Sequence, residues 1–334
     1  MERKIRFGVL GCSRIAQKSV IPAIIDSSHA QLSMIGSRSE KKARECAKQF
    51  GCDSFGTYED VLANKEVDAV YISLPNSLHE EWVVKAANMG KHVWCEKPAA
   101  LTYVSAKRMV EICKKNNVRL IEGFMFIYHP QHVKVKELIE TGILGTLVRF
   151  EGCFAFPMPD TGNIRLNASM GGGSYNDAGS YPIRASRMIF GEEPESIMCT
   201  LIIDPEMHVD TRARITLMYP NDRSAHLSSA FGEDFQSTYS VVGSRARIRM
   251  ERAYAVPKDK AVKIFLEIDS TVEEIVVEPA DHFKLLVDDF CKEILLGHAS
   301  AKNYEDDLVA QARIMEAGRT SSLENRTVHL REID

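Results

Sequence analysis

Two distant segments combine residue types that can move a proton beside a bound ligand. Trp94-Cys95-Glu96-Lys97-Pro98 closes an apolar stretch with a lysine, and open parallel sheets bind ligands beyond the carboxyl ends of their strands. Gly171-Gly172-Gly173 allows backbone to approach a ligand, and Asp177 and Tyr181 follow on one face of a helix. Each segment alone also fits an ordinary surface lysine or a half-buried helix face. Together they favour an acid–base site.

The lysine matters because a tyrosine is a poor base on its own. A free tyrosine has a pKa of about 10, which is too high for efficient proton transfer near neutral pH. An ammonium group at ~4 Å stabilises a phenolate by roughly 4 kcal/mol at an effective dielectric constant near 20. At about 1.4 kcal/mol per pKa unit, this lowers a tyrosine pKa by up to ~3. Lys97 could therefore supply the change that Tyr181 requires.

The first 123 residues alternate between strand and helix patterns. Strands are expected at Lys4–Gly11, Gln31–Ser37, Val67–Leu74, His92–Cys95 and Val118–Glu122, and helices at Arg14–Asp26, Glu40–Phe50, Leu78–Met89 and Thr102–Asn116. This alternation predicts right-handed crossovers and a doubly wound parallel sheet, in an α/β domain over residues 1–123.

The turn after the first strand is typical of a site for a dinucleotide's pyrophosphate. Backbone N–H groups and the helix dipole meet the phosphates there. The turn has the pattern Gly-x-Ser-x-x-Ala, and its expected cofactor contacts are Gly11, Cys12, Ser13, Arg14 and Ile15. Ser13 replaces the usual middle glycine, and its hydroxyl can donate to phosphate. A plain tight turn is the structural alternative.

The end of the second strand favours NADP(H) over NAD(H). An NAD site usually has a carboxylate here for the ribose diol, whereas this chain has Ser37 and Arg38. Arginine can stack on adenine and pair with a 2′-phosphate, and the serine hydroxyl can donate to it. Lys42, one helical turn on, adds positive charge. The alternative is an exposed arginine before a helix.

The expected strand Val67–Leu74 leads into a third group of candidate cofactor residues. Leu74, Pro75 and Asn76 can line the nicotinamide ribose with their backbone and one amide. His79 either belongs to the same side of the cofactor or is a first-turn residue of the next helix. These positions lie where an open parallel sheet binds its ligand.

Six motifs in this order resemble the glucose–fructose oxidoreductase / inositol dehydrogenase / rhizopine catabolism family (Gfo/Idh/MocA), over nearly the whole chain. They are Gly8–Ala16, Pro75-Asn76, Glu96-Lys97-Pro98, Asn163-Ile164-Arg165, Gly171-Gly172-Gly173 and Asp177-x-Gly179-x-Tyr181. The resemblance implies a Rossmann domain, then a domain built on an open, mostly antiparallel sheet. It also implies NAD(P)-dependent hydride transfer on a sugar or cyclic polyol.

The resemblance also implies roles for the acid–base residues. Tyr181 is expected to be the general acid in reduction and the base in oxidation. Lys97 lowers its pKa or donates to the substrate oxygen, and Asp177 orients the neighbouring sugar hydroxyl. Glu96 is expected to fix the end of the strand, and Pro98 is expected to pack against the nicotinamide. Arg165 is expected to contact the cofactor or the substrate. For Arg165, an ordinary loop arginine is the alternative.

Two positions bear on the substrate. Ile127 stands where many relatives have an arginine, so one cation is absent. Tyr181 replaces the histidine of the inositol dehydrogenase branch and resembles the glucose–fructose oxidoreductase, dihydrodiol dehydrogenase, xylose dehydrogenase and sugar 3-ketoreductase branches. The stretch Tyr181–Arg184 resembles the ketoreductases of deoxysugar pathways most. A sugar or nucleotide-sugar ketoreductase/dehydrogenase is therefore expected.

Two alternatives stay open. A trans-dihydrodiol or aldopentose dehydrogenase would use the same residues, and Phe154, Phe156 and Tyr175 could stack on a sugar or on a diol. A non-catalytic NAD(P)-sensing regulator, a role known in the family, would not need to retain the acid–base residues.

Residues 124–334 are expected to form a substrate-binding and oligomerisation α+β domain. Strand patterns dominate from 147 to 277, and alternation such as Ala213–Leu217 fits a sheet with one buried face. Helices are expected at 132–140, 281–296 and 304–323. Apolar residues such as Met198 and Val276 on the sheet predict a homo-oligomer, a dimer or tetramer.

Composition limits the remaining possibilities. The 334 residues suit two domains, and the net charge of -4 without a basic block argues against nucleic acid. Apolar runs are too short for a membrane span, and no signal-peptide region precedes the first strand. The eight cysteines form no Cys-x-x-Cys and no zinc pattern. A reduced, cytoplasmic protein without a metal is expected.

Overall fold

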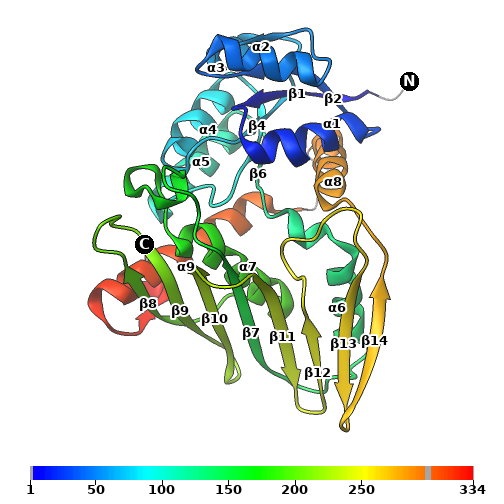
Figure 1. Cartoon of the computed structure of the whole chain (residues 1–334), viewed down its shortest axis with the longest axis vertical. Coiled ribbons are helices and arrows are strands. Elements are labelled where there is room, and N and C mark those ends of the chain that lie inside the picture. Colours follow the sequence, from blue (N-terminus) through cyan, green and yellow to red (C-terminus); the bar gives the residue numbers. More distant parts are fainter. Residues whose placement is uncertain (1–2, 298–301, 334) are drawn as a thin grey trace. The chain divides into compact units, whose positions relative to one another are not determined.

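The computed structural model describes residues 3–297 and 302–333 and shows two compact units (Figure 1). The first unit comprises the residues up to Met125 together with His282–Val309. The second comprises Phe126–Asp281 and the residues from Ala310 onward. The predicted domains, 1–123 and 124–334, were continuous segments, whereas the first unit includes the C-terminal helix α8 (His282–Leu296), which packs against α1 (Ile21–Asp26) and β2 (Ala30–Gly36).

A six-stranded parallel sheet in the order β3-β2-β1-β4-β5-β6 forms the first unit. Its remaining strands are β1 (Ile5–Leu10), β3 (Phe55–Gly56), β4 (Ala69–Ile72), β5 (His92–Cys95) and β6 (Leu120–Glu122). The helices between them are η1 (Ala16–Val20), which leads into α1, α2 (Glu40–Gln49), α3 (Tyr58–Ala63), η2 (Asn76–Leu78), α4 (His79–Asn88) and α5 (Tyr103–Lys115). This order confirms the predicted Rossmann sheet.

Burial explains why the sequence pattern predicted the central strands. All four residues of β4 are buried, as are Val93, Trp94 and Cys95 of β5. A parallel strand covered on both faces gives a continuous apolar run. The pattern missed β3 and α3, which span only two and six residues. Elements this short present too few residues to show a period.

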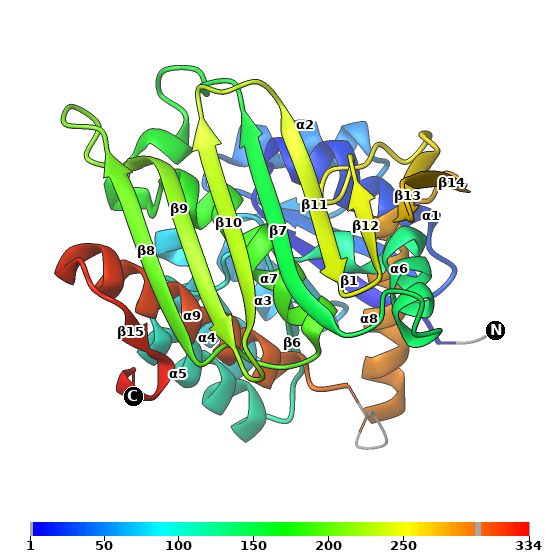
Figure 2. The same cartoon turned by 90° about the horizontal axis from the view of Figure 1, so that it is seen from below.

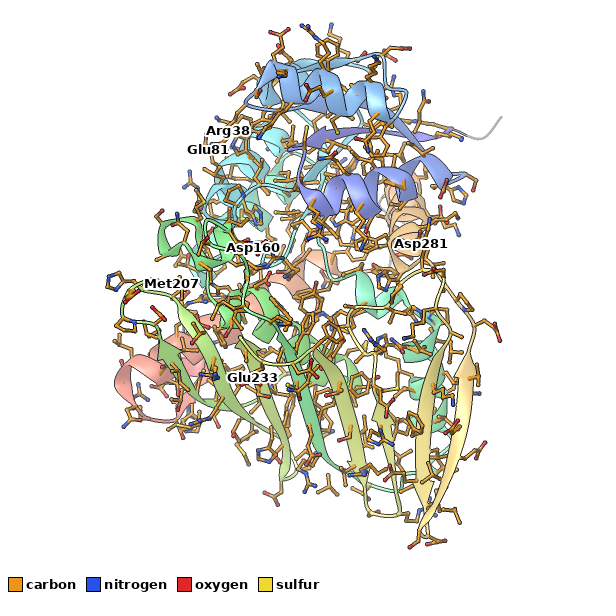
Figure 3. The ribbon with its side chains drawn as sticks, viewed as in Figure 1. Arg38, Glu81, Asp160, Met207, Glu233 and Asp281 are labelled. Carbon is orange, nitrogen blue, oxygen red and sulfur yellow. The ribbon has the colours of Figure 1, made fainter. Side chains whose placement is uncertain are left out.

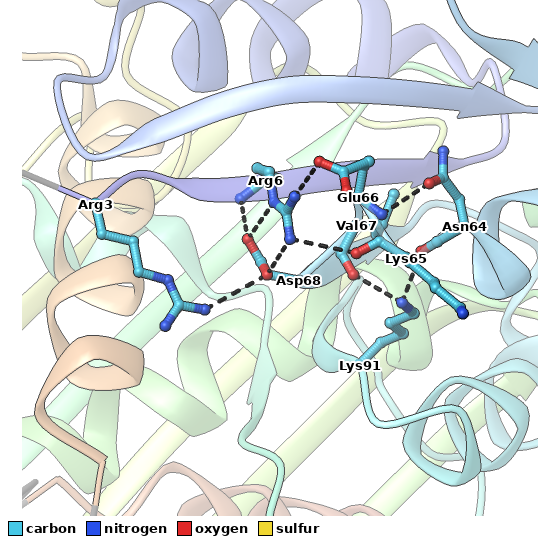
Figure 4. Close-up of polar contacts among 8 residues, drawn as sticks. All are labelled: Arg3, Arg6, Asn64, Lys65, Glu66, Val67, Asp68 and Lys91. Atoms are coloured by element: carbon cyan, nitrogen blue, oxygen red, sulfur yellow. Dashed lines mark hydrogen bonds and ion pairs between the residues drawn. The ribbon is translucent and has the colours of Figure 1, made fainter.

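Charged groups hold the amino ends of the strands together (Figure 4). Arg6 of β1 donates to both carboxylate oxygens of Asp68, which precedes β4, at 2.9 Å. Lys91, which precedes β5, donates to the carbonyl oxygens of Asn64 and Val67 at 2.8 and 2.7 Å. The network therefore lies at the amino-terminal edge of the sheet. The candidate functional residues lie at the opposite edge, beyond the carboxyl ends of the strands.

The second unit is built on a nine-stranded sheet in the order β14-β13-β12-β11-β7-β10-β9-β8-β15. Its strands are β7 (Leu147–Phe156), β8 (Ser196–Ile203), β9 (Asp210–Tyr219), β10 (Arg223–Phe231), β11 (Gln236–Gly243), β12 (Ala246–Met250), β13 (Val262–Ile268), β14 (Thr271–Val277) and β15 (Val328–His329). Figure 2 shows β8, β9, β10, β7, β11 and β12 side by side. Only β7 and β10 pair in parallel; the other pairs of these strands are antiparallel. The predicted mostly antiparallel sheet is confirmed.

Helices cover this sheet and carry the second group of candidate residues. The π-helical turn η6 (Tyr175–Gly179) leads directly into α7 (Ser180–Phe190), and both pack on β7 and β10. The remaining helical elements are η3 (Met125–Tyr128), α6 (Pro130–Glu140), η4 (Ile164–Leu166), η5 (Ala168–Met170), α9 (Tyr304–Glu324) and η8 (Leu330–Glu332). None of the helices in the described part of the chain has the length and apolar character that a membrane crossing requires.

Candidate functional site

The turn after β1 has the backbone form of a phosphate-binding turn. Gly11 has a φ of +104°, and a Cβ there would lie 3.0 Å from the carbonyl oxygen of Ser73, so glycine suits this position. The Ser13 hydroxyl accepts a backbone N–H from three residues on at 3.1 Å. The side-chain amide of Gln17 donates to the carbonyl oxygen of Cys12 at 2.9 Å. These bonds hold the turn ahead of the helix, where backbone N–H groups can bind an anion.

The end of β2 carries hydroxyl and cationic groups. Ser37 is buried, whereas Arg38 (Figure 3) and Lys42 are exposed. The Ser39 hydroxyl caps α2 by accepting the backbone N–H of Lys42 at 3.4 Å. No carboxylate stands between the last residue of β2 and Glu40. This donor set fits the 2′-phosphate of NADP better than a ribose diol, which requires an acceptor.

His79 joins the segments that follow β4 and β5. Its Nδ1 lies 2.9 Å from the carbonyl oxygen of Pro98, and its Nε2 lies 3.0 Å from that of Leu74. The side chain has no exposed surface, and burial lowers the pKa of His79 although the carbonyl oxygens oppose this. It is the first residue of α4. Pro75 and Asn76, beside this connection, are partly exposed.

The Glu96-Lys97-Pro98 segment is held by hydrogen bonds to two carboxylates. Glu96 accepts the hydroxyl of Tyr71, a fully buried residue of β4, at 2.7 Å. Glu122, the last residue of β6, accepts the backbone N–H of Ala99 at 2.8 Å. The Lys97–Pro98 peptide bond is cis, and Lys97 is partly exposed. Tyr71 and Glu122 were not among the predicted residues; polar groups in or at the end of apolar strands were the available signal.

In the second unit, the glycine run Gly171–Gly173 packs closely against η4. The backbone N–H of Gly173 donates to the carbonyl oxygen of Arg165 at 2.9 Å, and a Cβ on Gly172 would lie 2.4 Å from that oxygen. The Nε of Arg165 then lies 2.7 Å from a carboxylate oxygen of Asp177. The arginine side chain is 42% exposed and the aspartate 16%. The structure thus brings together two of the predicted residues.

Tyr181 stands in the first turn of α7 and is fixed by other aromatic rings. Its ring centroid lies 5.0 Å from Phe154, 5.7 Å from Phe126 and 5.8 Å from Tyr254. The whole residue is 6% exposed. Aromatic pairs at these separations stabilise one ring orientation. The ring orientation of the proposed proton donor is therefore set by packing.

Asp210 anchors the start of the segment that carries Asp177, and the sequence pattern did not single it out. Its carboxylate accepts the Ser174 hydroxyl at 2.8 Å and the backbone N–H of Tyr175 at 2.6 Å. A Cβ on Gly173 would lie 2.2 Å from the same carboxylate. Burial raises the pKa of Asp210, against the opposing effect of these hydrogen bonds. The third glycine of the run, Gly173, is thus needed because any larger residue would clash with the buried carboxylate of Asp210.

Tyr175 does not fit the expectation that it stacks on a substrate. It is 1% exposed, and its hydroxyl donates to the carbonyl oxygen of Met315 in α9 at 3.2 Å. A Cβ on Gly318 would lie 2.0 Å from that hydroxyl. Tyr175 therefore locks η6 to α9. Phe154 packs on Tyr181, and Phe156 lies against Phe231 at 5.2 Å.

The predicted cofactor residues of the first unit gather at one edge of its sheet. They follow the carboxyl ends of β1, β2, β4 and β5, and comprise Gly11, Cys12, Ser13, Arg14, Ile15, Ser37, Arg38, Lys42, Leu74, Pro75, Asn76, His79, Glu96, Lys97 and Pro98. The second unit brings Arg165, Asp177 and Tyr181 to its glycine run and the start of α7. Within residues 3–297 and 302–333, no group of His, Cys, Asp or Glu side chains is arranged to hold a metal ion.

Known proteins resemble this chain over almost its full length. A dTDP-3,4-didehydro-2,6-dideoxy-alpha-D-glucose 3-reductase of Saccharopolyspora spinosa is 32% identical over 323 residues, which cover 95% of this chain and 97% of the relative. A D-xylose 1-dehydrogenase (NADP(+)) of Haloferax volcanii is 33% identical over 304 residues, 90% of this chain and 93% of the relative.

Solved structures show the same fold. A 3-ketoreductase from Actinomadura kijaniata, crystallised with NADP and TDP-benzene, has a TM-score of 0.92 at 30% identity, covering 96% of this chain and 98% of that one. Variants of that enzyme with one tyrosine or one lysine replaced have also been solved.

Two family models match separate parts of the chain. Residues 5–124 match the oxidoreductase family with an NAD-binding Rossmann fold, and residues 132–249 match the GFO/IDH/MocA C-terminal domain. The order of the matched parts is that of the motifs found in the sequence, and the relatives span both parts. The chain belongs to the GFO/IDH/MocA family of oxidoreductases.

Proposed function

We propose that this protein is an NADP(H)-dependent oxidoreductase that transfers hydride to or from a carbon of a sugar or nucleotide-sugar. The carrying observation is the carboxyl edge of the first sheet, where the Gly11 turn, the cationic end of β2 and Lys97 lie together. The comparisons confirm the predicted class, because the relatives are NADP-dependent sugar dehydrogenases and a sugar 3-ketoreductase solved with NADP.

The cofactor would be held by the groups that the first unit presents at this edge. The turn Gly11–Ile15 supplies backbone N–H groups for the pyrophosphate. Ser37, Arg38 and Lys42 supply a hydroxyl and two cations for the 2′-phosphate. When bound, the nicotinamide supplies or accepts the hydride. The absence of a carboxylate directly after β2 supports NADP(H) over NAD(H).

The proton would be moved with the help of a tyrosine and a lysine. Tyr181 donates it in reduction and accepts it in oxidation, and Lys97 stabilises negative charge on the phenol or the substrate oxygen. Asp177 accepts a hydrogen bond from the neighbouring sugar hydroxyl. Support comes from the packing that fixes the ring of Tyr181.

For the substrate we propose a keto group of a deoxy nucleotide-sugar. Tyr181–Arg184 resembles the ketoreductases of deoxysugar pathways, and a relative that acts on a dTDP-linked sugar spans both units. An aldopentose dehydrogenase is the second candidate. A D-xylose dehydrogenase is 33% identical to this chain over 304 residues, compared with 32% over 323 residues for the 3-reductase.

The sheet of the second unit supports a homo-oligomer. Met198 of β8 and Met218 of β9 lie on one face, because Met218 pairs with Ser196, two residues from Met198. They are 36% and 42% exposed, and Val276 on β14 is 56% exposed. We infer that a second copy covers this face.

Steady-state kinetics on Lys97→Ala and Tyr181→Phe test the proposed roles. Each should lower kcat by about 10²-fold or more, since a positioned proton donor or charge stabiliser is lost, while NADPH titration shows that the cofactor still binds. The matched controls are Lys115→Ala and Tyr103→Phe, outside the proposed site. A panel of keto nucleotide-sugars, pentoses and diols, followed by NADPH absorbance, selects the substrate class. Near-normal kcat in both test variants would overturn the assignment.

A further inference from the structure

Cys12 and Cys46 are neighbours although 34 residues separate them. The Cys12 Sγ lies 3.7 Å from the carbonyl oxygen of Lys42 in α2. Cys46 follows Lys42 by one helical turn, and helical side chains point back toward the helix N-terminus. The Cys46 thiol therefore lies over the turn that Cys12 touches. The two thiols are close enough for each to change the pKa of the other.

The environment of Cys12 differs from that of the other described cysteines. Cys95, Cys113, Cys199 and Cys291 are buried, and burial raises the pKa of each thiol. Cys12 is partly exposed, as are Cys52 and Cys153, but burial raises the pKa of the latter two thiols. The hydrogen bond from Cys46 lowers the pKa of Cys12 to about 7 against the effect of burial, and Ser37 and Lys42 act in the same direction. Of the two thiols, Cys12 therefore loses its proton more readily and is the better nucleophile.

Cys12 also lies among the groups that would bind the cofactor. It is the second residue of the Gly11–Ile15 turn, and its sulfur contacts Ser37 and the backbone of Lys42. Any covalent change at this sulfur therefore acts on both the pyrophosphate turn and the 2′-phosphate groups. Cys46, by contrast, is 3% exposed and is not one of the residues expected to bind the cofactor.

We propose that Cys12 and Cys46 form a reversible thiol-modification site, at which a low-molecular-weight disulfide converts the two thiols to a disulfide that closes the cofactor turn. This proposal extends the proposed function, because it assigns the same turn a second, covalent state. The S–S bond of about 2.05 Å is shorter than any contact between two free thiols, and both cysteines are free in this structure. Its formation must draw the turn and α2 together, at the place where phosphate would bind.

The chemistry balances with oxidised glutathione as the oxidant. The Cys12 thiolate attacks one glutathione sulfur, and the glutathione that leaves takes up the proton that Cys12 lost. Cys46 then loses its proton and attacks the Cys12 sulfur. The second glutathione leaves and takes up that proton. Two protein thiols are oxidised to one disulfide, and one glutathione disulfide is reduced to two thiols.

The test combines peptide mapping with NADPH titration on the full chain. After incubation with oxidised glutathione, non-reducing peptide maps should show a Cys12–Cys46 cross-link. NADPH affinity should fall by about tenfold or more, comparable to the loss of one hydrogen bond to a charged group. Dithiothreitol should restore it, and saturating NADPH should slow the cross-linking.

Two variants separate this site from general thiol oxidation. Cys46→Ser should bind NADPH normally when reduced and retain glutathione on Cys12, because no second thiol is present to release it. Cys52→Ser, the control on the segment after α2, should cross-link as the wild type does. A Cys12–Cys52 cross-link, no cross-link at Cys12, or unchanged NADPH affinity after cross-linking overturns the proposal. If the reduced protein does not bind NADPH at all, the assignment of NADP(H) as the cofactor is wrong. The peptide map still tests whether Cys12 and Cys46 form a disulfide.

Discussion

The Nε of Arg165 lies 2.7 Å from a carboxylate oxygen of Asp177, although Arg165 comes from the short helix η4 and Asp177 from the turn η6 that precedes α7. The same arginine receives the backbone N–H of Gly173 on its carbonyl oxygen. Arg165 thus joins η4 to the glycine run through its backbone and to η6 through its side chain. This makes the position of Asp177 depend on Arg165.

Replacement of Arg165 by alanine should therefore act through Asp177. We expect kcat/KM to fall by about tenfold, since a charge-assisted hydrogen bond is lost. In a double-mutant cycle with Asp177→Asn, the second substitution should add little. Arg212→Ala, which breaks the exposed Arg212–Glu233 pair in the same unit, is the control and should leave kinetics unchanged. Fully additive effects in the cycle would contradict the coupling.

Arg38 should distinguish the two nicotinamide cofactors. Arg38→Ala is expected to weaken NADPH binding by about 10- to 100-fold, because a charge-assisted contact to the 2′-phosphate is lost. NADH, which lacks this phosphate, should bind as before. The measurement is a fluorescence titration with each cofactor. Arg44→Ala on α2, where Arg44 pairs with Glu40, is the matched control. Equal affinities of the wild type for NADPH and NADH would remove the basis for the preference.

Asp210 should support activity without touching substrate. Asp210→Ala leaves the Ser174 hydroxyl and the Tyr175 N–H without their acceptor, at a cost of about 1–3 kcal/mol for each buried group. The loosened η6 turn should lower kcat more than it raises KM. Asp210→Asn keeps an acceptor oxygen and should recover part of kcat. A loss of stability with unchanged kcat in the alanine variant would show a purely structural role.

The same carboxylate predicts a pH dependence of stability. Burial raises the pKa of Asp210 above its ordinary value of 3.8, so the folded state binds a proton that the unfolded state has released. Stability from this group is therefore greatest below pH 3.8 and declines as the pH rises through the folded pKa. Urea denaturation at pH 4 and pH 7 should show Asp210→Asn gaining stability relative to the wild type at the higher pH. The opposite trend would contradict the direction.

Sequence patterns predicted elements where burial and period agree. The continuous apolar runs of β4 and β5 and the alternation in β9 are examples. Asp210 escaped prediction for a local reason. In β9, Arg212 and Arg214 are exposed, and Asp210 shares their parity, yet it is buried. The pairing with β8 shifts between Ile202 and Ile203, so the strand bulges and the side-chain alternation is broken.

The packing between distant segments could not be predicted from the sequence for another reason. The amphipathic pattern of α8 predicted a helix with a buried face, but a pattern within one segment does not show which sheet the face covers. Its Asp288 accepts the hydroxyl of Ser27, which follows α1. Tyr175 similarly looked available to a ligand, and only the fold shows its hydroxyl on α9. Contacts between distant segments are not encoded in local periodicity.

The Arg6–Asp68 pair provides a stability prediction away from the proposed site (Figure 4). Burial would raise the pKa of Asp68, but hydrogen bonds from Arg6 outweigh it, and the pKa is lowered. For an acid with a lowered folded pKa, the stabilisation is present above the unfolded pKa and is lost as the pH falls through the folded pKa. Asp68→Asn should therefore destabilise the protein by about 1–3 kcal/mol at pH 7.

Urea denaturation of the wild type and Asp68→Asn between pH 7 and pH 3 checks this direction. The difference in unfolding free energy should stay constant near neutral pH and shrink in acid, because the wild-type carboxylate is then protonated as well. Glu274→Gln is the control, since the Lys263–Glu274 pair is about half exposed and should contribute about 1 kcal/mol or less. If the difference in unfolding free energy grew as the pH fell, the protonated Asp68 would stabilise the folded protein more than the carboxylate does. The Arg6–Asp68 ion pair would then not be what holds β1 to β4.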